Sequence, residues 1–163
     1  MKKNLLMNFS IDHTKLKINI EREFSAVLEK VWASRTESDI IDKRRAPRPF
    51  QTKTKVMDFK EWGYWLYVMV WPNKEEYWSK TDFTSIVPLK SYAGKDSFCD
   101  NKGNIDQSLP RSIWHINFNQ NWDSTIVSIE ITYNNLSDLE KTIEMWFKEW
   151  ITSAFKNLDE IIM

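Results

Sequence analysis

The stretch "LSDLEKTIEMWFKEWITSAFKNLDEIIM" runs from Leu136 to Met163 and decides the fold predicted for this chain. Its apolar side chains recur at spacings of three and four residues, which puts them on one face of an α-helix. Ser137 followed by Glu140 fits a capping box, so we expect one continuous helix from near Ser137 to about Leu158. The residues of the apolar face are Leu139, Ile143, Trp146, Trp150, Ala154, Leu158 and Ile161, widened by Phe147, Ile151 and Phe155. A face this wide has to be buried against a large apolar surface.

A run of strands supplies that surface. In the segment 124–133, Val127, Ile129 and Ile131 alternate with Ser128 and Glu130, which is typical of a strand with one buried face. Similar segments recur at regular intervals with turn residues between them, a pattern that favours an antiparallel meander. We predict seven strands, at about 16–22, 50–59, 63–71, 75–89, 91–100, 112–120 and 124–133.

Two short helices are predicted between the first two strands. Ser25 is a plausible N-cap for the first helix, and Ser38 starts the second, which cannot continue through Pro47. The predicted fold is therefore α+β, with a curved seven-stranded antiparallel sheet around a long C-terminal helix, in one domain over residues 1–163. A cavity between sheet and helix is a usual place for a small-molecule site.

Composition narrows the classes of partner. The 163 residues carry 23 basic and 23 acidic side chains, so no long-range field would gather nucleic acid or anionic lipid. No apolar run reaches the ~18 residues of a membrane span. The single cysteine, Cys99, cannot form an internal disulfide, and no targeting segment is visible, so we expect a cytoplasmic protein.

Three stretches together resemble a known family. "INIEREFSAVLEKVWASRTESDIID", "MDFKEWGYWLYVMVWPN" and "LEKTIEMWFKEWITSAFKNLDEII" are similar to the domain homologous to the activator of the ninety-kDa heat-shock protein ATPase (AHSA-type). That domain belongs to the START-like (SRPBCC) superfamily, whose birch-pollen-allergen-like fold is a helix grip. The resemblance covers the chain from about Phe9 to Ile162 and implies this fold.

The chain also departs from the family pattern. "KRRAP", with Arg44 and Arg45, replaces a Trp-Trp-x-Pro-like element, and Trp62-Gly63 replaces a glycine pair. Tryptophan stands at 71, 146 and 150, where glycine is common in the family. The resemblance therefore implies a smaller cavity than in glycine-bearing relatives, displaced toward the Pro47–Phe50 loop or the Asp100–Gln107 loop.

The aromatic stretch "FKEWGYWLYVMVWP" (Phe59–Pro72) can fill the core, line a pocket or stack on nucleic-acid bases. Strand alternation puts Trp65, Tyr67 and Met69 on one face, where we expect them to meet Trp146 and Trp150. Base stacking is disfavoured because the strand has no Lys or Arg. The candidate cavity residues are Phe50, Trp65, Tyr67, Met69, Trp78, Phe98, Trp114, Trp146 and Trp150.

Other reactive side chains are isolated in the sequence. No metal-ligand or nucleophile pattern surrounds His115 or Cys99. Asp58 and Glu61 are expected to be a solvent-exposed pair of carboxylates. The basic cluster at 43–48 is expected in an exposed loop. Without a catalytic or phosphate-binding motif we expect no enzyme activity, no metal and no cofactor.

Three functions remain open. The first is a non-catalytic domain that binds a hydrophobic small molecule, which an open cavity would favour. The second is a chaperone- or protein-interaction module, which a filled cavity and an exposed apolar patch would favour. The third is an enzyme like the polyketide cyclases or aromatases of the superfamily, which two titratable groups converging in the cavity would favour.

Overall fold

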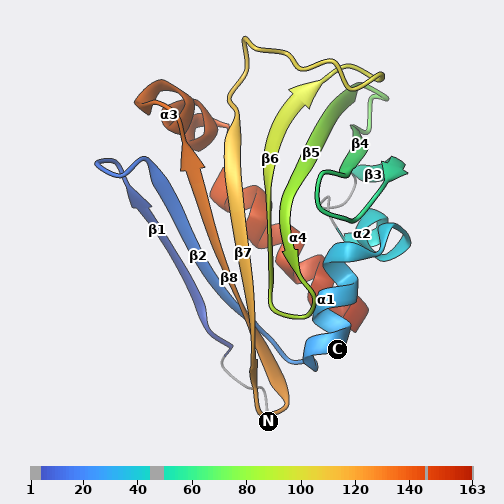
Figure 1. Cartoon of the computed structure of the whole chain (residues 1–163), viewed down its shortest axis with the longest axis vertical. Helices are drawn as coiled ribbons and strands as arrows, with labels where there is room; N and C mark the ends of the chain where they lie inside the picture. Colours follow the sequence, from blue (N-terminus) through green and yellow to red (C-terminus); the bar gives the residue numbers. More distant parts are fainter. Residues whose placement is uncertain (1–4, 45–49, 146, 163) are drawn as a thin grey trace.

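The computed structural model describes residues 5–44, 50–145 and 147–162, and one antiparallel sheet dominates that part of the chain (Figure 1). Its strand order is β1-β2-β8-β7-β6-β5-β4-β3. The strands are β1 (Met7–Asp12), β2 (Lys17–Phe24), β3 (Gln51–Met57), β4 (Tyr64–Val70), β5 (Glu76–Val87), β6 (Ser91–Cys99), β7 (Ser112–Asn121) and β8 (Ser124–Tyr133). The helices are α1 (Leu28–Thr36), α2 (Ser38–Arg44), α3 (Leu136–Glu144) and α4 (Phe147–Ile162). The predicted α+β class is confirmed.

The sheet has eight strands rather than the predicted seven, because β1 precedes the first predicted strand. Met7, Phe9 and Ile11 alternate with polar residues, so a short strand pattern was present in the sequence. Asp12 shapes the turn into β2: its carboxylate accepts hydrogen bonds from the backbone amides of Thr14 and Lys15 at 3.0 and 2.9 Å. β1 pairs with β2 alone, as an edge strand only six residues long.

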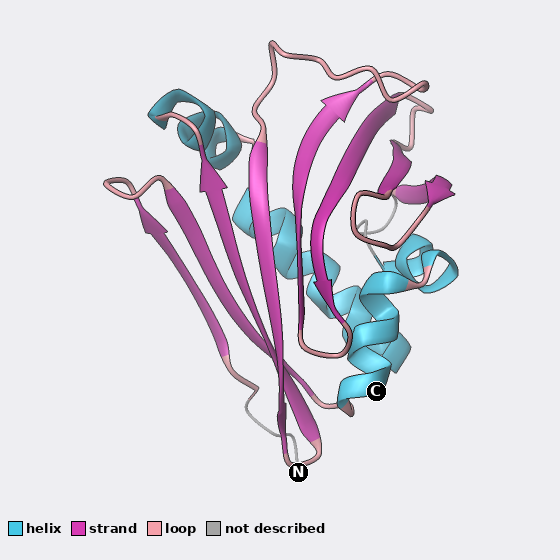
Figure 2. Cartoon of the chain, viewed as in Figure 1, coloured by secondary structure: helices cyan, strands magenta, loops and turns pink. Residues whose placement is uncertain are grey.

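The sheet curves around α4, which crosses its concave face (Figure 2). The pairing register shifts in β3 between Thr54 and Val56 and in β5 between Phe83 and Ser85, and such bulges bend a strand. The buried side chains of the concave face and of the helices form one core. Phe24 of β2 and Phe155 of α4 meet edge to face within it, with ring centroids 5.5 Å apart.

The predicted continuous C-terminal helix is wrong: the segment forms two helices. Met145 ends α3, and its amide donates to the carbonyl oxygens of Lys141 and Thr142 at 3.1 and 3.2 Å. The break lets α3 lie beside the end of β8 while α4 crosses the sheet (Figure 1). Periodicity alone could not reveal it, because no Gly or Pro marks the break.

The predicted helix starts are also corrected. Asn135 is the N-cap of α3, and its side chain accepts from the amide of Asp138 at 2.8 Å, so Ser137 lies inside the helix. Val27 precedes α1 and makes no side-chain cap, so Ser25 is not the N-cap. α2 begins at Ser38, as predicted.

The turn between β3 and β4 accommodates the change of the family's glycine pair to Trp62-Gly63. A Cβ on Gly63 would lie 2.2 Å from the carbonyl oxygen of Asp58, so this second position requires glycine. Trp62 has φ 68°, a left-handed conformation that favours glycine, and its indole is exposed to solvent. No described helix is long and apolar enough to cross a membrane.

Candidate functional site

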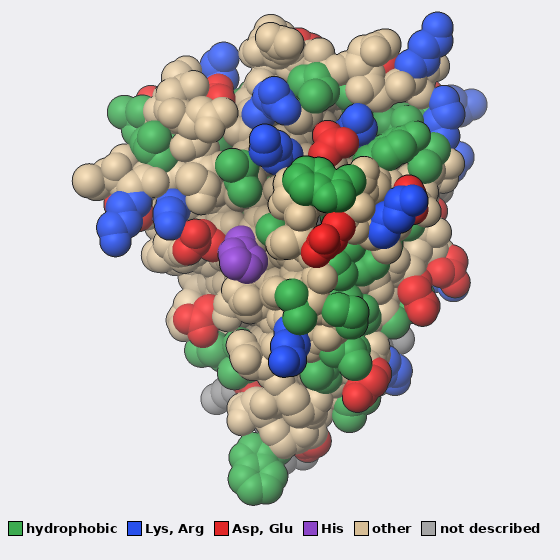
Figure 3. Space-filling view, in the orientation of Figure 1, with side chains coloured by type: hydrophobic (Ala, Val, Ile, Leu, Met, Phe, Trp, Pro, Cys, Tyr) green, Lys and Arg blue, Asp and Glu red, His purple; other side chains and the backbone are tan. Residues whose placement is uncertain are grey.

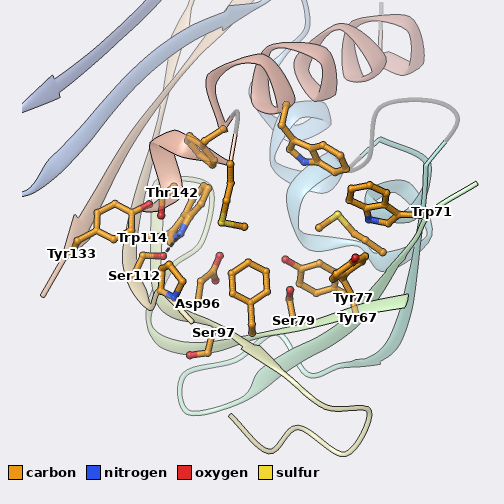
Figure 4. A pocket seen from close by; sticks show the side chains of 16 residues that line it. Tyr67, Trp71, Tyr77, Ser79, Asp96, Ser97, Ser112, Trp114, Tyr133 and Thr142 are labelled. Carbon is orange, nitrogen blue, oxygen red and sulfur yellow. Dashed lines mark hydrogen bonds between the residues drawn. The ribbon is translucent and has the colours of Figure 1, made fainter. Parts of the chain in front are cut away.

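A cavity of about 290 Å³ lies between the concave face of the sheet and the junction of α3 with α4 (Figure 4). Strands β4 to β8 supply its floor, and the helix junction supplies the opposite wall. The lining residues are Tyr67, Met69, Trp71, Tyr77, Ser79, Asp96, Ser97, Phe98, Pro110, Ser112, Trp114, Tyr133, Thr142, Met145, Phe147 and Trp150. Pro110 and Phe98 flank the 100–107 loop, so the cavity lies at the end of the sheet where a displaced pocket was predicted.

The cavity has a buried floor and an exposed rim. Tyr67 and Trp114 on the floor are buried, whereas Trp71, Tyr77 and Met145 are 38, 42 and 53% exposed. The cavity therefore reaches solvent past these three side chains.

Aromatic rings build one side of the rim. The Phe50 ring lies 5.0 Å from the Trp71 ring and 5.2 Å from the Trp150 ring, measured between centroids. The Tyr77 ring lies 5.2 Å from Trp71 on its other side. These four residues, which we call the aromatic rim, join β4 and β5 to α4.

Several polar groups of the cavity lie on β6, β7 and β8, and Ser79 of β5 and Thr142 of α3 add two more hydroxyls. Asp96 accepts a hydrogen bond from the Thr81 hydroxyl at 2.5 Å. The Trp114 indole donates to the Ser112 hydroxyl at 3.0 Å (Figure 4). These groups form a polar zone on the opposite side of the cavity from Trp71 and Tyr77 (Figure 4).

Tyr133 lies in the same zone. Burial, with smaller contributions from the negative charges of Asp96 and Asp138, raises the pKa of Tyr133 to about 12, against the opposing effect of a hydrogen bond with Thr142. Its phenol is thus neutral at physiological pH.

Most of the predicted cavity residues lie at or near this site. Tyr67, Met69, Phe98, Trp114 and Trp150 line the cavity, and Phe50 belongs to the aromatic rim. Tyr67, Met69 and Trp150 line the same cavity, and direct contact between them stays a prediction. Trp146 lies outside the described residues.

Trp65 lies deeper than predicted. Its ring stacks on Tyr67 with centroids 3.8 Å apart, and its indole donates to the Thr54 hydroxyl at 3.0 Å. It lines a separate cavity of about 30 Å³ rather than the main one. Trp65 therefore supports the Tyr67 ring from the side that faces away from the main cavity.

Trp78 was assigned to the wrong face of the sheet. Tyr77 and Ser79 point into the cavity, so Trp78 between them points to the outer face. There the Lys55 ammonium lies 5.7 Å from its ring centroid. The strand itself was predicted, but the face that β5 turns inward depended on its pairing with β4.

The sequence reasoning missed the rim and the polar zone. Alternation could have found Tyr133, because it shares a face with Ile129 and Ile131. Trp71 and Tyr77 become neighbours only through the pairing of β4 with β5, and Met145 reaches the rim only because the helix breaks there. No local sequence signal encodes those contacts.

The other reactive candidates lie away from the cavity. His115 is exposed on β7, and a histidine side chain (purple) is visible on the face of the molecule drawn in Figure 3. Burial is the main cause that raises the pKa of the half-buried Cys99. Asp58 pairs with Lys60 at 3.5 Å, and Glu61 accepts from the amide of Ile86 at 3.3 Å.

Two findings concern metal and the basic cluster. Among the described residues, no group of three or more His, Cys, Asp or Glu side chains is placed to hold a metal ion. Within the basic cluster 43–48, residues 45–48 lie outside the described residues.

The chain was compared with known proteins. No protein-family model and no curated protein sequence matches it. Among solved structures, protein Ms6760 from Mycobacterium smegmatis is similar with a TM-score of 0.89 and 22% identity, over 98% of this chain and 97% of that one. The AHSA1 (SPO3351) protein from Silicibacter pomeroyi has a TM-score of 0.69 and 16% identity, over 88% and 95% of the two chains.

This chain has the START-like helix-grip fold. CalU16 from Micromonospora echinospora is also similar, with a TM-score of 0.62 and 14% identity over 99% of this chain and 77% of CalU16. The predicted resemblance to the START-like superfamily is confirmed at the level of the fold, because identities this low establish shape alone. The activity of this domain has to be argued from its own cavity.

Proposed function

We propose that this START-like domain binds a compact hydrophobic molecule in the cavity between β4–β8 and the α3–α4 junction, and that it does not transform it. The observation that carries the proposal is an open, largely aromatic cavity of about 290 Å³. Ligand sites in proteins are typically concave and apolar, with volumes of roughly 300–1,000 Å³ and a few polar groups that fix orientation. This cavity stands at the lower end of that range, which favours a molecule of one or two rings.

Different lining residues supply the apolar surface and the hydrogen-bonding groups for a ligand. Rings such as Trp114, Phe147 and Trp150 provide apolar surface, and burying ligand surface against them supplies roughly 25 cal/mol per Å² before the costs of association. Asp96, Ser112 and Tyr133 provide hydrogen-bonding groups at one end. A bound molecule would therefore enter past the aromatic rim and orient its polar end toward β6–β8.

The protein-interaction alternative has less support. A filled cavity would favour it, whereas the cavity is open among the described residues. Exposed tryptophans do exist at the tips of two turns, Trp62 and Trp122. They are single side chains on separate turns, and nothing on this surface indicates which partner would cover them.

An enzyme is the second candidate, and one observation favours it. Asp96 and Tyr133 are titratable, and both line the same cavity. With a substrate bound, Asp96 would act as the general base and the neutral Tyr133 phenol would act as a hydrogen-bond donor. Incubating stoichiometric protein with any molecule that co-purifies with it separates the two functions: an unchanged mass of that molecule supports binding alone, and a changed mass that Asp96→Asn prevents supports catalysis.

Binding is tested first by native mass spectrometry of freshly purified protein, where a co-purifying molecule would appear as added mass. A second measurement titrates the neutral apolar dye N-phenyl-1-naphthylamine and follows its fluorescence. Ser79→Phe places a ring on the cavity floor, between Tyr67 and Phe98 in the sheet register, and should abolish the fluorescence rise.

The matched control is Ser85→Phe, because Ser85 is exposed on the same strand outside the cavity. It should bind the dye like the parent. Thermal melts of both variants check folding, and Ser79→Leu replaces Ser79→Phe should the larger ring prevent folding. Equal dye binding by parent and both Ser79 variants would contradict the proposed site.

A further inference from the structure

One buried polar side chain on the cavity floor has no hydrogen-bond partner among the described residues. Ser79 of β5 is only 7% exposed, and its side chain points into the cavity (Figure 4). Its hydroxyl makes no hydrogen bond with any residue that the structure describes. Four other hydroxyls of the lining do have partners within the protein, namely those of Tyr77, Ser97, Ser112 and Thr142. The Ser79 hydroxyl is therefore open to a molecule inside the cavity.

The need for space alone does not explain a serine at this position. Tyr67 of β4 and Phe98 of β6 are the cross-strand partners of Ser79, and all three side chains line the cavity. A small residue between two rings leaves room for a ligand, but alanine would leave at least as much room. Burying a hydroxyl without a hydrogen bond costs free energy, which alanine would avoid. The serine is better explained by a hydrogen bond that forms when the cavity is filled.

The hydroxyl also limits the kind of ligand group that fits. A serine side chain offers one O–H donor and two acceptor lone pairs, and no described residue uses either function at Ser79. A hydroxyl group on a ligand donates and accepts, so it can use both functions, whereas an ether or carbonyl oxygen can only accept. A ligand ring would pack against Tyr67 and Phe98 in the offset or edge-to-face geometry that aromatic groups prefer. The floor therefore matches a hydroxyl group carried by an aromatic ring.

We propose that the cavity selects a hydroxylated aromatic molecule, a phenol of one or two rings, whose hydroxyl group forms a hydrogen bond with Ser79. This inference rests on the proposed binding function and adds the chemical class of the ligand to it. It places a polar contact on β5, apart from Ser112 and Tyr133 on β7 and β8. A hydrocarbon of the same shape fills the cavity but leaves the Ser79 hydroxyl unpaired, which is how a polar site rejects such an analogue.

Two probes of nearly one shape test the selectivity: 2-naphthol and 2-methylnaphthalene, whose dissociation constants are measured by equilibrium dialysis at pH 7. Ser79→Ala should weaken 2-naphthol about fivefold or more, the effect of one net hydrogen bond, and should leave 2-methylnaphthalene within about twofold. Ser79→Thr keeps the hydroxyl, so the ratio of the two constants should stay within about twofold of the parent's. Ser85→Ala is the control and should change neither constant, because Ser85 is exposed on the same strand outside the cavity.

The stability of Ser79→Ala gives a second readout. The substitution removes a hydroxyl that has no described partner in the free protein, so the midpoint of thermal unfolding should equal or exceed the parent's. A clearly lower midpoint would mean that the hydroxyl is hydrogen-bonded within the protein, and this would overturn the proposal.

The binding outcomes separate the two proposals. If Ser79→Ala weakens both probes equally, or neither of them, the phenol proposal is wrong and the binding function stands. If Ser112→Ala weakens 2-naphthol selectively and Ser79→Ala does not, the ligand hydroxyl lies at β7 and the proposal is overturned. A co-purifying molecule without a hydroxylated ring would also overturn it. If neither probe binds the parent and no molecule co-purifies with the protein, both proposals fail.

Discussion

At the scale of single residues, a series of hydrogen bonds supports the cavity floor from the side that faces away from the cavity. The Thr54 hydroxyl donates to the Asp42 carboxylate at 2.5 Å and accepts from the Trp65 indole at 3.0 Å. It therefore ties α2 to β3 and β4, and Trp65 in turn stacks on Tyr67 of the cavity floor. Thr52, two residues earlier on the same face of β3, is buried whereas Thr54 is half-buried, and the Thr52 hydroxyl has no hydrogen-bond partner among the described residues.

Replacing threonine by valine should lower the free energy of unfolding at Thr54 but not at Thr52. Thr54→Val removes two hydrogen bonds and should lower the free energy of unfolding by about 1–3 kcal/mol. Thr52→Val replaces an unsatisfied buried hydroxyl by a methyl group of the same shape, so its effect should be neutral or stabilising by up to about 1 kcal/mol. Urea melts measure both, and equal losses would mean that the hydrogen-bond assignment on β3 is wrong.

At the scale of elements, the break between α3 and α4 shapes the cavity. α3 ends at Glu144, its C-cap Met145 is half exposed and lines the cavity, and α4 begins at Phe147, which lines the wall. Two helices with separate axes leave space at their junction that one straight helix would cover. The residue at which α3 starts also affects the shape of the cavity, because it sets where the helix ends relative to the sheet.

The corrected N-cap of α3 gives a matched pair of substitutions. Asn135→Ala removes the acceptor of the Asp138 amide and should cost about 1 kcal/mol of stability, within a range of roughly 0.5–2. Ser137→Ala lies inside the helix on an exposed position and should change stability by less than about 0.5 kcal/mol. Thermal melts followed by far-ultraviolet circular dichroism would detect the difference; a larger loss from Ser137→Ala would restore the capping box.

At the scale of the whole molecule, the sheet forms a wedge whose narrow end is packed and whose wide end is hollow. The strands converge near the β7–β8 hairpin and spread toward the ends of β6 and β8 (Figure 1). Phe24, Val127 and Phe155 fill the space between sheet and α4 toward that hairpin, whereas the cavity opens near the 100–110 loop. Stability and binding are thus separated along the length of the sheet.

Two isoleucines on adjacent strands test this arrangement. Ile129 of β8 is 2% exposed on the concave face, and Ile129→Ala should cost about 2–5 kcal/mol because it leaves a cavity in the core. Ile113 of β7 is 42% exposed, and Ile113→Ala should cost less than about 1 kcal/mol. Ile143 was also predicted to be a core residue, but it is only half-buried. The loss of stability from Ile143→Ala should therefore lie between the losses from Ile129→Ala and Ile113→Ala. Similar urea midpoints for the Ile129 and Ile113 variants would contradict the assignment of faces.

The sequence by itself determined most of the elements and most of the sheet. Alternation located seven strands, and the spacing of Leu139, Ala154 and Leu158 assigned the buried face of the C-terminal segment, because a side chain's direction in a regular element depends only on its position. The same rule placed Tyr67 and Met69 on the face that lines the cavity.

Only the tertiary structure decided the site itself. The pairing of β4 with β5 turned Tyr77 inward and Trp78 outward, and the helix break puts Met145 at the cavity wall. Each of these depends on contacts between residues far apart in the chain, whose free energy outweighs local preference. Local periodicity describes which face of an element is apolar, but a cavity is the volume that packed elements leave between them, and no single segment encodes it.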